Sequence, residues 1–365
     1  MRPTSRCVSA LLISCAVLAN GCHQTQASAS RAPDAQASPA GQGATAISVK
    51  APSQSAPSKS STRTLDWAEV IEAEVDPFVV MDPRIRDAIK ATGLPWRVRD
   101  IGTNIEMLLI PPGEFVMGKS RGDDQAGQNE LPTHEVKLTK AFYLGRYEVT
   151  QQQYAKVTKL TPSRFDHPAV PIIPTLERLM ADGATKSQAE REVSEAEDKL
   201  KSWIAIQQQP APYPKGKEWP VEQVSRDDCA VFCNQSGLRL PTEAEWEFAC
   251  RAGTSTPAFG KLEEIAWYAN SPRERLGESR AVGTKRANAL GLHDMLGNVW
   301  EWVNDCYGDY SADPQTDPQG PTVVLAGVCR GGCCRSDSND CRASIRRSNP
   351  NSIFDVLGFR AARTP

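Results

Sequence analysis

Alternating hydrophobic and polar positions in the first half of the chain predict short strands. Residues 107–118, MLLIPPGEFVMG, predict a strand, a turn at the Pro-Pro-Gly sequence and a second strand. Residues 134–157, HEVKLTKAFYLGRYEVTQQQYAKV, predict two alternating strands and then a helix that Thr150 caps. These elements place the start of the main domain near Ile101.

Residues 220–253, PVEQVSRDDCAVFCNQSGLRLPTEAEWEFACRAG, predict two helices. Gly237 and Gly253 stand where these helices end, since glycine adopts the left-handed conformation of a helix terminus without strain. Trp246 and Phe248 are predicted core residues. Both helix starts carry capping-box spacing, in which each side chain satisfies the other residue's exposed amide: Ser225 with Asp228, and Thr242 with Glu245.

Residues from about 166 to 216 form a predicted helical insertion between these regions. Apolar side chains recur there at alternating steps of four and three, the spacing of one helix face: Ala189, Val193, Ala196, Leu200 and Trp203. Two interpretations remain open. The helix packs this stripe on its own domain, or it docks a partner, because the same spacing forms the seam of a coiled coil.

Residues 1–22 have the pattern of an export signal. Two arginines precede an apolar run at 8–18, and small residues lead up to Cys22. We expect Cys22 to be acylated after cleavage, as in a lipoprotein signal; a plain cleaved signal peptide is the alternative. No segment reaches the roughly 18 apolar residues that span a bilayer. The sequence therefore predicts an exported protein of the cell envelope, facing the periplasm or cell surface and touching the membrane only through its lipid anchor.

Residues 23–64 are rich in Ala, Ser, Gln, Pro and Gly, which predicts a disordered tether, because such a segment cannot bury enough apolar surface to offset the entropy of ordering. Residues 65–100 predict a short helical preface that includes a helix from Asp82 to Thr92. The remaining residues, 101–365, are long enough for one large domain.

Charge and cysteine content narrow the classes of function. The net charge is −2 with no basic stripe, so nucleic acid is not an expected partner. No two of the four histidines have metal-ligand spacing, which disfavours a zinc hydrolase. Eight cysteines follow residue 200, and an even number in an exported chain predicts a disulfide framework whose pairing stays open.

Three long motifs carry a resemblance to a known family. They are RGGCCRSDSNDCRASIRRSNPNSIFDVLGFRAAR at 330–363, GLHDMLGNVWEW at 291–302 and RLPTEAEWEFACRAGT at 239–254. Together they resemble the formylglycine-generating enzymes, also called sulfatase-modifying-factor domains. The resemblance runs from about 101 to 363, minus the insertion. It implies an α+β protein with the variant C-type-lectin-like fold, in which much of the structure is irregular.

The resemblance also implies a chemistry, because the enzymes of the family hold copper(I) between two cysteines. These cysteines are the fourth and ninth residues after the Arg-Gly-Gly turn, positions that Ser336 and Cys341 hold here. A serine hydroxyl is a poor copper(I) ligand. The chain therefore resembles the generic, non-catalytic members, and we expect a binding or scaffolding module. The alternative is a copper-dependent oxidase that converts a cysteine of sulfatase-type substrates to formylglycine, with Cys334 and Cys341 as the pair.

A structural calcium site is the second implication of the resemblance. In the family, the segment that matches 294–302, DMLGNVWEW, wraps a calcium ion with side-chain and backbone oxygens, a donor set that suits a hard cation. The matching positions here are Asp294, Gly297, Val299 and Glu301.

Three arginines lie near the groove that the resemblance implies: Arg330, Arg342 and Arg346. Their guanidinium groups could bind a carboxylate or a sugar, or they could form internal ion pairs. The surface at 333–356 is the candidate face for an envelope protein or a small ligand.

Overall fold

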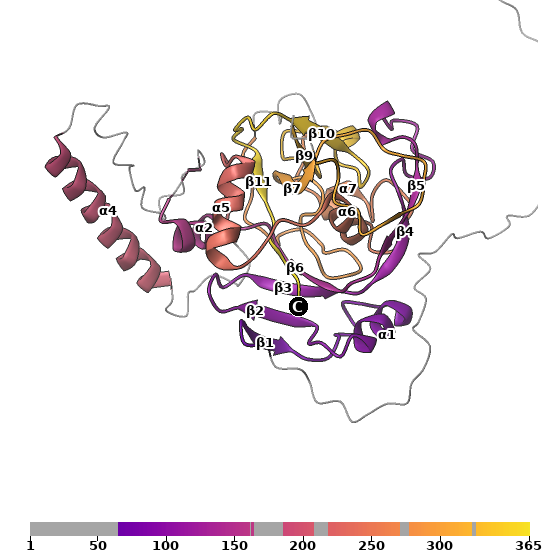
Figure 1. The fold of residues 1–365 in the computed structure, drawn as a ribbon, viewed down its shortest axis with the longest axis horizontal. Coiled ribbons are helices and arrows are strands. Elements are labelled where there is room, and N and C mark those ends of the chain that lie inside the picture. Colours follow the sequence, from indigo (N-terminus) through magenta and orange to yellow (C-terminus); the bar gives the residue numbers. More distant parts are fainter. Residues whose placement is uncertain (1–64, 161, 164–184, 208–217, 271–276, 323–325) are drawn as a thin grey trace, which may run out of the picture. The chain divides into compact units, whose positions relative to one another are not determined.

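The computed structural model describes residues 65–160, 162–163, 185–207, 218–270, 277–322 and 326–365 (Figure 1). The predicted signal, its Cys22 and the predicted tether lie outside these residues. Within the described part of the chain, no helix is both long and apolar enough to cross a bilayer.

The first sheet joins the start of the described chain to its end. It has five strands in the order β1-β2-β3-β6-β12, and every neighbouring pair is antiparallel. The strands are β1 (Ala68–Glu72), β2 (Arg97–Asp100), β3 (Glu106–Ile110), β6 (Phe142–Gly145) and β12 (Ala362–Arg363). The C-terminal strand thus closes the sheet beside β6 (Figure 1).

The predicted helical preface is only partly helical, which corrects that prediction. Helix α1 (Pro83–Ala91) is capped by Asp82, whose carboxylate accepts from the Arg84 amide at 2.9 Å, and it ends at Thr92 as predicted. On either side, β1 and β2 enter the first sheet. Burial alternates from residue to residue along β2, as in a strand, because Val98 is buried between the half-buried Arg97 and Arg99.

Two further sheets build the rest of the domain. One has the order β4-β5-β8 and the other the order β10-β9-β7-β11; β5–β8 and β7–β11 are parallel pairs. Their strands are β4 (Gly113–Met117), β5 (His134–Leu138), β7 (Trp300–Cys306), β8 (Gln315–Thr316), β9 (Gly327–Arg330), β10 (Arg346–Asn349) and β11 (Leu357–Phe359). The strands predicted in 107–118 and 134–157 are confirmed, although β3 and β4 belong to different sheets.

The described helices confirm the predicted caps. They are α2 (Gln151–Thr158), α4 (Lys186–Gln207), α5 (Arg226–Ser236), α6 (Glu243–Arg251), α7 (Leu262–Ile265) and the 3-10 turns η1 (Gln128–Glu130) and η3 (Ser338–Asp340). Capping boxes open α2, α5 and α6 at Thr150, Ser225 and Thr242. Gly237 ends α5 in the left-handed conformation, and Ala252 does so for α6 just before Gly253.

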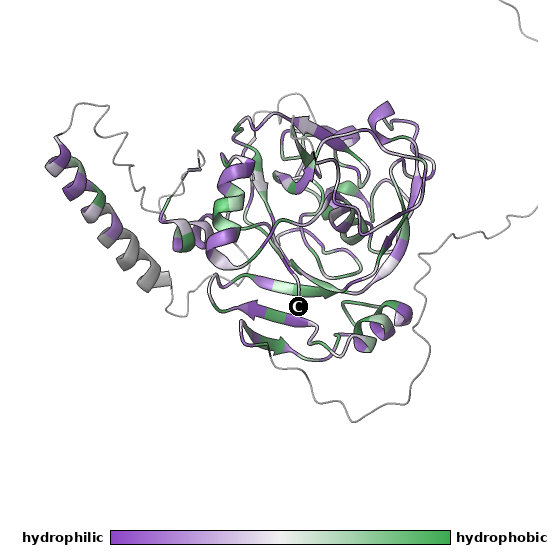
Figure 2. Ribbon diagram, in the orientation of Figure 1, coloured by the Kyte–Doolittle hydropathy of each residue, from purple (hydrophilic) through white to green (hydrophobic). Residues whose placement is uncertain are grey.

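Helix α4 occupies part of the predicted insertion at 166–216, and the flanking parts of that insertion lie outside the described residues. On its predicted apolar face, Ala189 is buried and Val193 is half-buried. Nothing is described for the side chains of the other three stripe residues (grey in Figure 2). Packing on its own domain and docking of a partner therefore both stay predictions.

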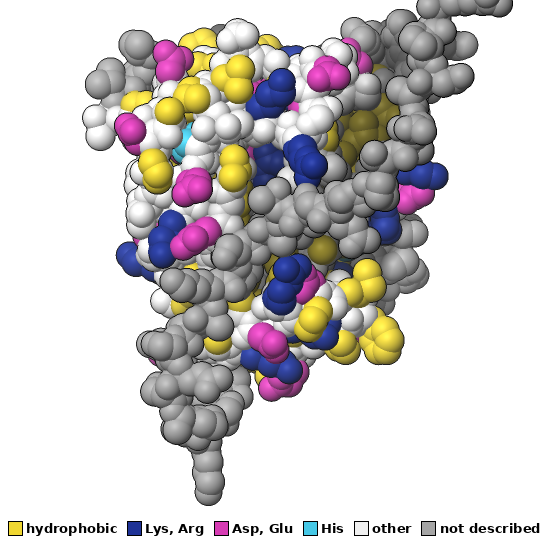
Figure 3. Space-filling view, turned by 90° about the vertical axis from the view of Figure 1, so that its right-hand side faces the viewer, with side chains coloured by type: hydrophobic (Ala, Val, Ile, Leu, Met, Phe, Trp, Pro, Cys, Tyr) yellow, Lys and Arg dark blue, Asp and Glu magenta, His cyan; other side chains and the backbone are white. Residues whose placement is uncertain are grey.

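Aromatic side chains from distant segments meet in one core. Trp246 is fully buried and Phe248 is nearly so, which confirms their prediction as core residues. Phe232 of α5 packs against Phe359 of β11 with ring centroids 5.3 Å apart. Full burial of one such side chain stabilises the fold by about 1.5–3 kcal/mol. On the face in Figure 3, acidic and basic side chains are interspersed with apolar ones.

Gly297→Ala tests a close backbone contact of the fold, with Gly93→Ala as the control. Both glycines have a positive φ, which costs an alanine about 1–2 kcal/mol. A Cβ at Gly297 would also lie 2.3 Å from the carbonyl oxygen of Trp267, whereas a Cβ at Gly93 meets nothing within 4 Å. In urea unfolding, Gly297→Ala should lose a further 1–3 kcal/mol or so of unfolding free energy. Equal losses would contradict this packing.

Candidate functional site

The Arg-Gly-Gly turn starts the loop that holds the predicted chemistry. Strand β9 ends at Arg330, and Gly331 and Gly332 follow with φ of 94° and 79°. A Cβ on Gly332 would lie 2.6 Å from the carbonyl oxygen of Asp340, so only glycine allows this close approach. The turn directs the next residues inward, where the Cys334 amide donates to the Asn298 carbonyl at 2.8 Å.

The two positions of the family's copper pair hold a serine and an enclosed thiol. The Ser336 hydroxyl accepts from the Cys333 amide at 3.2 Å and lies 3.5 Å from the Cys333 sulfur. Cys341 is fully buried, and this burial raises the pKa of its thiol. A thiol that keeps its proton is a weak metal ligand, because the thiolate is the ligand form.

The substitute pair of Cys334 and Cys341 stays a prediction, and both of its cysteines are buried. The Cys334 thiol donates to the Gly277 carbonyl at 3.8 Å.

The predicted disulfide framework is wrong for the described residues. All eight of their cysteines are free thiols, and all are buried: Cys229, Cys233, Cys250, Cys306, Cys329, Cys333, Cys334 and Cys341. Several lie in the main core, where a free cysteine packs as a small hydrophobic residue. An even count of cysteines therefore did not indicate pairing here.

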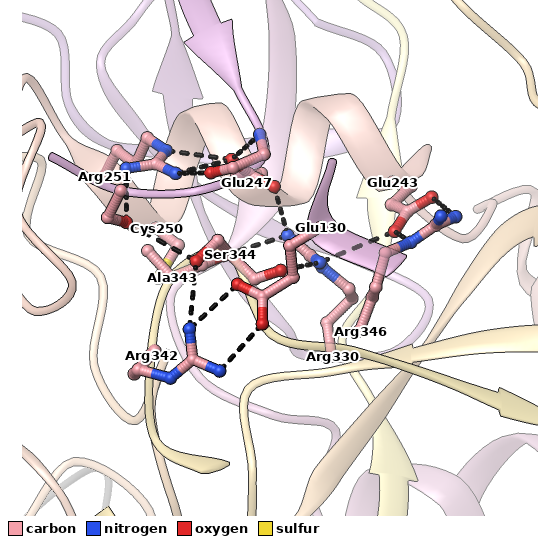
Figure 4. Close-up of polar contacts among 12 residues, drawn as sticks. Glu130, Glu243, Glu247, Cys250, Arg251, Arg330, Arg342, Ala343, Ser344 and Arg346 are labelled. Atoms are coloured by element: carbon pink, nitrogen blue, oxygen red, sulfur yellow. Dashed lines mark hydrogen bonds and ion pairs between the residues drawn. The ribbon is translucent and has the colours of Figure 1, made fainter. Parts of the chain in front are cut away.

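Two of the three arginines predicted to bind a ligand form ion pairs with helix α6 (Figure 4). Arg330 is fully buried, and its guanidinium group contacts Glu247 and lies 3.5 Å from Glu243. Arg346 donates to both carboxylate oxygens of Glu243 at 2.8 Å. Arg251 also donates to Glu247, at 2.7 Å, so each carboxylate has two cationic neighbours.

The third arginine, Arg342, also forms internal ion pairs. It contacts Glu130 at 2.8 Å and Asp123 at 2.5 Å, and all three side chains are buried. The structure therefore corrects the ligand-binding prediction for Arg330, Arg342 and Arg346 in favour of internal ion pairs. Their partners are far away in sequence, which is why the pattern of arginines alone left both interpretations open.

The predicted calcium segment contains one carboxylate oxygen without a partner. The Oδ2 atom of Asp294 accepts from the Gly283 amide at 2.6 Å, whereas its buried Oδ1 atom has no hydrogen-bond partner among the described residues. Burial raises the pKa of Asp294 to about 6. By contrast, Glu301 accepts from Arg360 at 2.6 Å and from the Trp246 indole at 2.7 Å.

A third buried carboxylate, Glu148, was missed by the sequence analysis. It accepts from the Asn298 amide group at 2.8 Å and from the Val299 backbone amide at 3.3 Å. Burial, together with the charges of Asp294 and Glu301, raises its pKa. Among the described residues, no group of three or more His, Cys, Asp or Glu side chains is placed to hold a metal. The predicted donor set therefore fits a cation only in part, through the Oδ1 atom of Asp294.

A cavity of about 300 Å³ lies beside the Glu243–Arg346 pair. Its lining includes Met117, His134, Asp305 and Tyr310. Asp305 accepts from the backbone amide of Glu243 at 2.8 Å, and burial raises its pKa to about 7. This mixed lining could hold a small ligand with hydrogen-bond donors. Of the residues that line this cavity, the sequence analysis predicted only Arg346 as a site residue.

Arg330→Met should lower the free energy of unfolding by about 3–5 kcal/mol, because it leaves buried carboxylates without their cation. The matched control is Arg347→Met, since Arg347 is 55% exposed and pairs with Asp340 at the surface. An exposed pair contributes at most about 1 kcal/mol. Urea unfolding of both variants measures the difference. Similar losses in the two would show that the buried network does not stabilise the domain.

Comparisons with known proteins place the chain in a family. A family model described as the sulfatase-modifying factor enzyme 1-like domain matches residues 97–365. The formylglycine-generating enzyme of Streptomyces coelicolor is 30% identical over 69% of this chain and 87% of its own length. A Bos taurus protein named inactive C-alpha-formylglycine-generating enzyme 2 is 28% identical over 73% of this chain and 91% of its own length.

The fold is shared with a solved structure. PvdO from Pseudomonas aeruginosa superposes with a TM-score of 0.53 at 23% identity, over 74% of this chain and 98% of PvdO. This likeness concerns the fold alone, and with the mixed helices and sheets it confirms the predicted α+β, variant C-type-lectin-like fold of the formylglycine-generating-enzyme type. The chain belongs to the formylglycine-generating enzyme, or sulfatase-modifying factor, family.

Proposed function

We propose that this chain is a non-oxidising member of its family that acts as a binding or scaffolding module. The observation that carries the proposal is the state of the copper-pair positions. One holds the Ser336 hydroxyl, and the other holds the fully buried Cys341, whose pKa is raised. Two activated sulfurs placed to within tenths of an ångström are what the oxidation would need. The name of the inactive Bos taurus relative adds that the family includes such members.

The surface at 333–356 offers a contact for a partner protein of the envelope. Ile353 and Phe354 are adjacent and each is about half exposed, at 53% and 52%. The segment before them is held in place, because Asn351 donates to Asp227 at 2.9 Å and accepts from the Arg226 amide at 2.9 Å. A fixed, exposed apolar pair suits the core of a protein–protein contact. A small ligand would instead use the cavity beside Asp305.

Export and anchoring complete the proposal. Acylation of Cys22 would hold the protein at the cell envelope, facing the periplasm or the cell surface, and residues 23–64 would let the domain stand away from the membrane. Contact with the membrane would then be through the lipid alone, and nucleic acid is not part of this proposal.

Turnover of a sulfatase-type peptide tests the proposal against the oxidase alternative. The purified, reduced chain is loaded with copper and given a Cys-X-Pro-X-Arg peptide under oxygen. Mass spectrometry should find no aldehyde product, because one of the two required sulfurs is missing. The Streptomyces coelicolor enzyme, treated identically, is the positive control. Aldehyde formation that disappears in Cys341→Ser would replace this proposal with a copper-dependent oxidase that uses Cys334 and Cys341.

We further propose a structural calcium ion at the segment 294–301. The support is the unpartnered Oδ1 atom of Asp294, which lies in a buried cluster with the carboxylates of Glu148 and Glu301. Arg360 pairs with Glu301, the third carboxylate of the cluster. Asp294 would hold the ion together with backbone oxygens at Gly297 and Val299. The ion would supply positive charge and rigidity.

Chelation tests the calcium proposal through stability. Removing calcium with EGTA should lower the midpoint temperature of thermal unfolding. Adding calcium back should raise this midpoint as the calcium concentration rises, because a ligand that binds only the folded state stabilises that state. Asp294→Ala should abolish this response. Asp305→Ala removes another buried carboxylate and should leave it intact. A wild-type midpoint that does not respond to chelation or to added calcium would refute the proposal.

A further inference from the structure

The cavity beside the Glu243–Arg346 pair is lined by a buried carboxylate, that of Asp305, which is 3% exposed. Its Oδ2 atom accepts from the Glu243 backbone amide at 2.8 Å, and the described residues provide no other hydrogen bond or ion pair to this carboxylate. A Cβ on Gly320, another lining residue, would lie 3.0 Å from the Oδ1 atom of Asp305. Oδ1 therefore lies at the cavity wall without a partner among the described residues.

The cation of the lining is engaged elsewhere. Among the described residues that line the cavity, Arg346 is the only arginine or lysine. Its guanidinium group donates to both carboxylate oxygens of Glu243 and to the Gly308 carbonyl, each at 2.8 Å (Figure 4). Asp309 also lines the cavity and is exposed. The lining therefore has three carboxylates and one guanidinium group, which Glu243 already neutralises.

The rest of the lining suits a compact ligand with a short apolar body. Apolar side chains contribute to it from three segments of the chain: Met117, Ala244, Pro318 and Pro321. The aromatic ring of Tyr310 lies in the same wall. The volume of about 300 Å³ is at the small end of the range for ligand cavities, so the ligand has few heavy atoms.

We propose that this cavity binds a small organic ammonium ion, whose N–H groups donate to the Asp305 carboxylate while its carbon body contacts the apolar part of the lining. A hydrogen bond between two ionised groups is stronger than one between neutral groups. A neutral ligand of the same shape would leave the buried carboxylate without a counter-charge. The inference rests on the proposed binding function and specifies its class of ligand. It involves neither position of the copper pair.

Benzylamine and benzyl alcohol test the proposal, because they have nearly the same shape and only the amine carries a charge. Each is titrated into the full-length chain by isothermal titration calorimetry at about pH 8, above the Asp305 pKa of about 7, so the carboxylate is charged. Benzylamine should bind roughly 10- to 100-fold more tightly, because only it forms a charged hydrogen bond. Equal affinities, or no measurable binding of either compound, would overturn the proposal.

Asp305→Asn is the matching variant of the protein. Asparagine keeps an oxygen to accept from the Glu243 amide but has no charge. The affinity for benzylamine should fall to that for benzyl alcohol. Asp124→Asn is the control and should bind like the wild type, since Asp124 is exposed and does not line the cavity. Wild-type affinity in Asp305→Asn would refute the site.

Hydrogen–deuterium exchange of the wild-type chain locates the ligand without any variant. Benzylamine should slow the exchange of backbone amides within 305–321, the segment that supplies most of the lining. Slowing only in other segments would overturn the proposal even if Asp305→Asn does not fold. The copper turnover assay fails or succeeds separately: an aldehyde product would refute the proposed non-oxidising function, whereas loss of amine selectivity would refute only this inference.

Discussion

The buried charges on helix α6 are the interaction on which the rest of the domain depends. Glu243, Glu247 and Arg251 follow one another at steps of four, so they lie along one side of the helix. Their partners are Arg346 of β10, Arg330 of β9 and the backbone just after β4 (Figure 4). A buried charge is tolerated only where partners surround it. The network therefore fixes both ends of the loop between β9 and β10, which carries the cysteines.

A second buried pair ties the end of the chain to the same helix. Arg360, just after β11, contacts Glu301 of β7, and Glu301 also accepts from Trp246 of α6. Arg360 further donates to the Gly145 carbonyl at the end of β6, beside which β12 pairs. Arg360 thus links the first sheet, through Gly145, to Glu301 and so to α6. Glu301 accepts hydrogen bonds from Trp246 and Arg360. In the predicted calcium segment, Asp294 is therefore the carboxylate with an oxygen that has no hydrogen-bond partner among the described residues.

The loop that resembles the family's copper-binding loop keeps one of the two cysteines. A serine stands where the first copper cysteine would be, and its hydroxyl supports the sulfur of Cys333 instead. Cys341 keeps its position but is enclosed. Binding needs only a rigid, well-placed surface, whereas oxidation needs two matched thiolates.

The sequence by itself determined the family, the helix starts and the turns, because these depend on contacts within a few residues. The capping boxes at Ser225 and Thr242 each close over three residues. Only the tertiary structure decided the roles of the charged and sulfur-bearing side chains. Arg330 meets Glu247 across 83 residues and Arg342 meets Glu130 across 212, distances over which local spacing carries no information. The free state of the cysteines was decided in the same way, by packing in three dimensions rather than by their number.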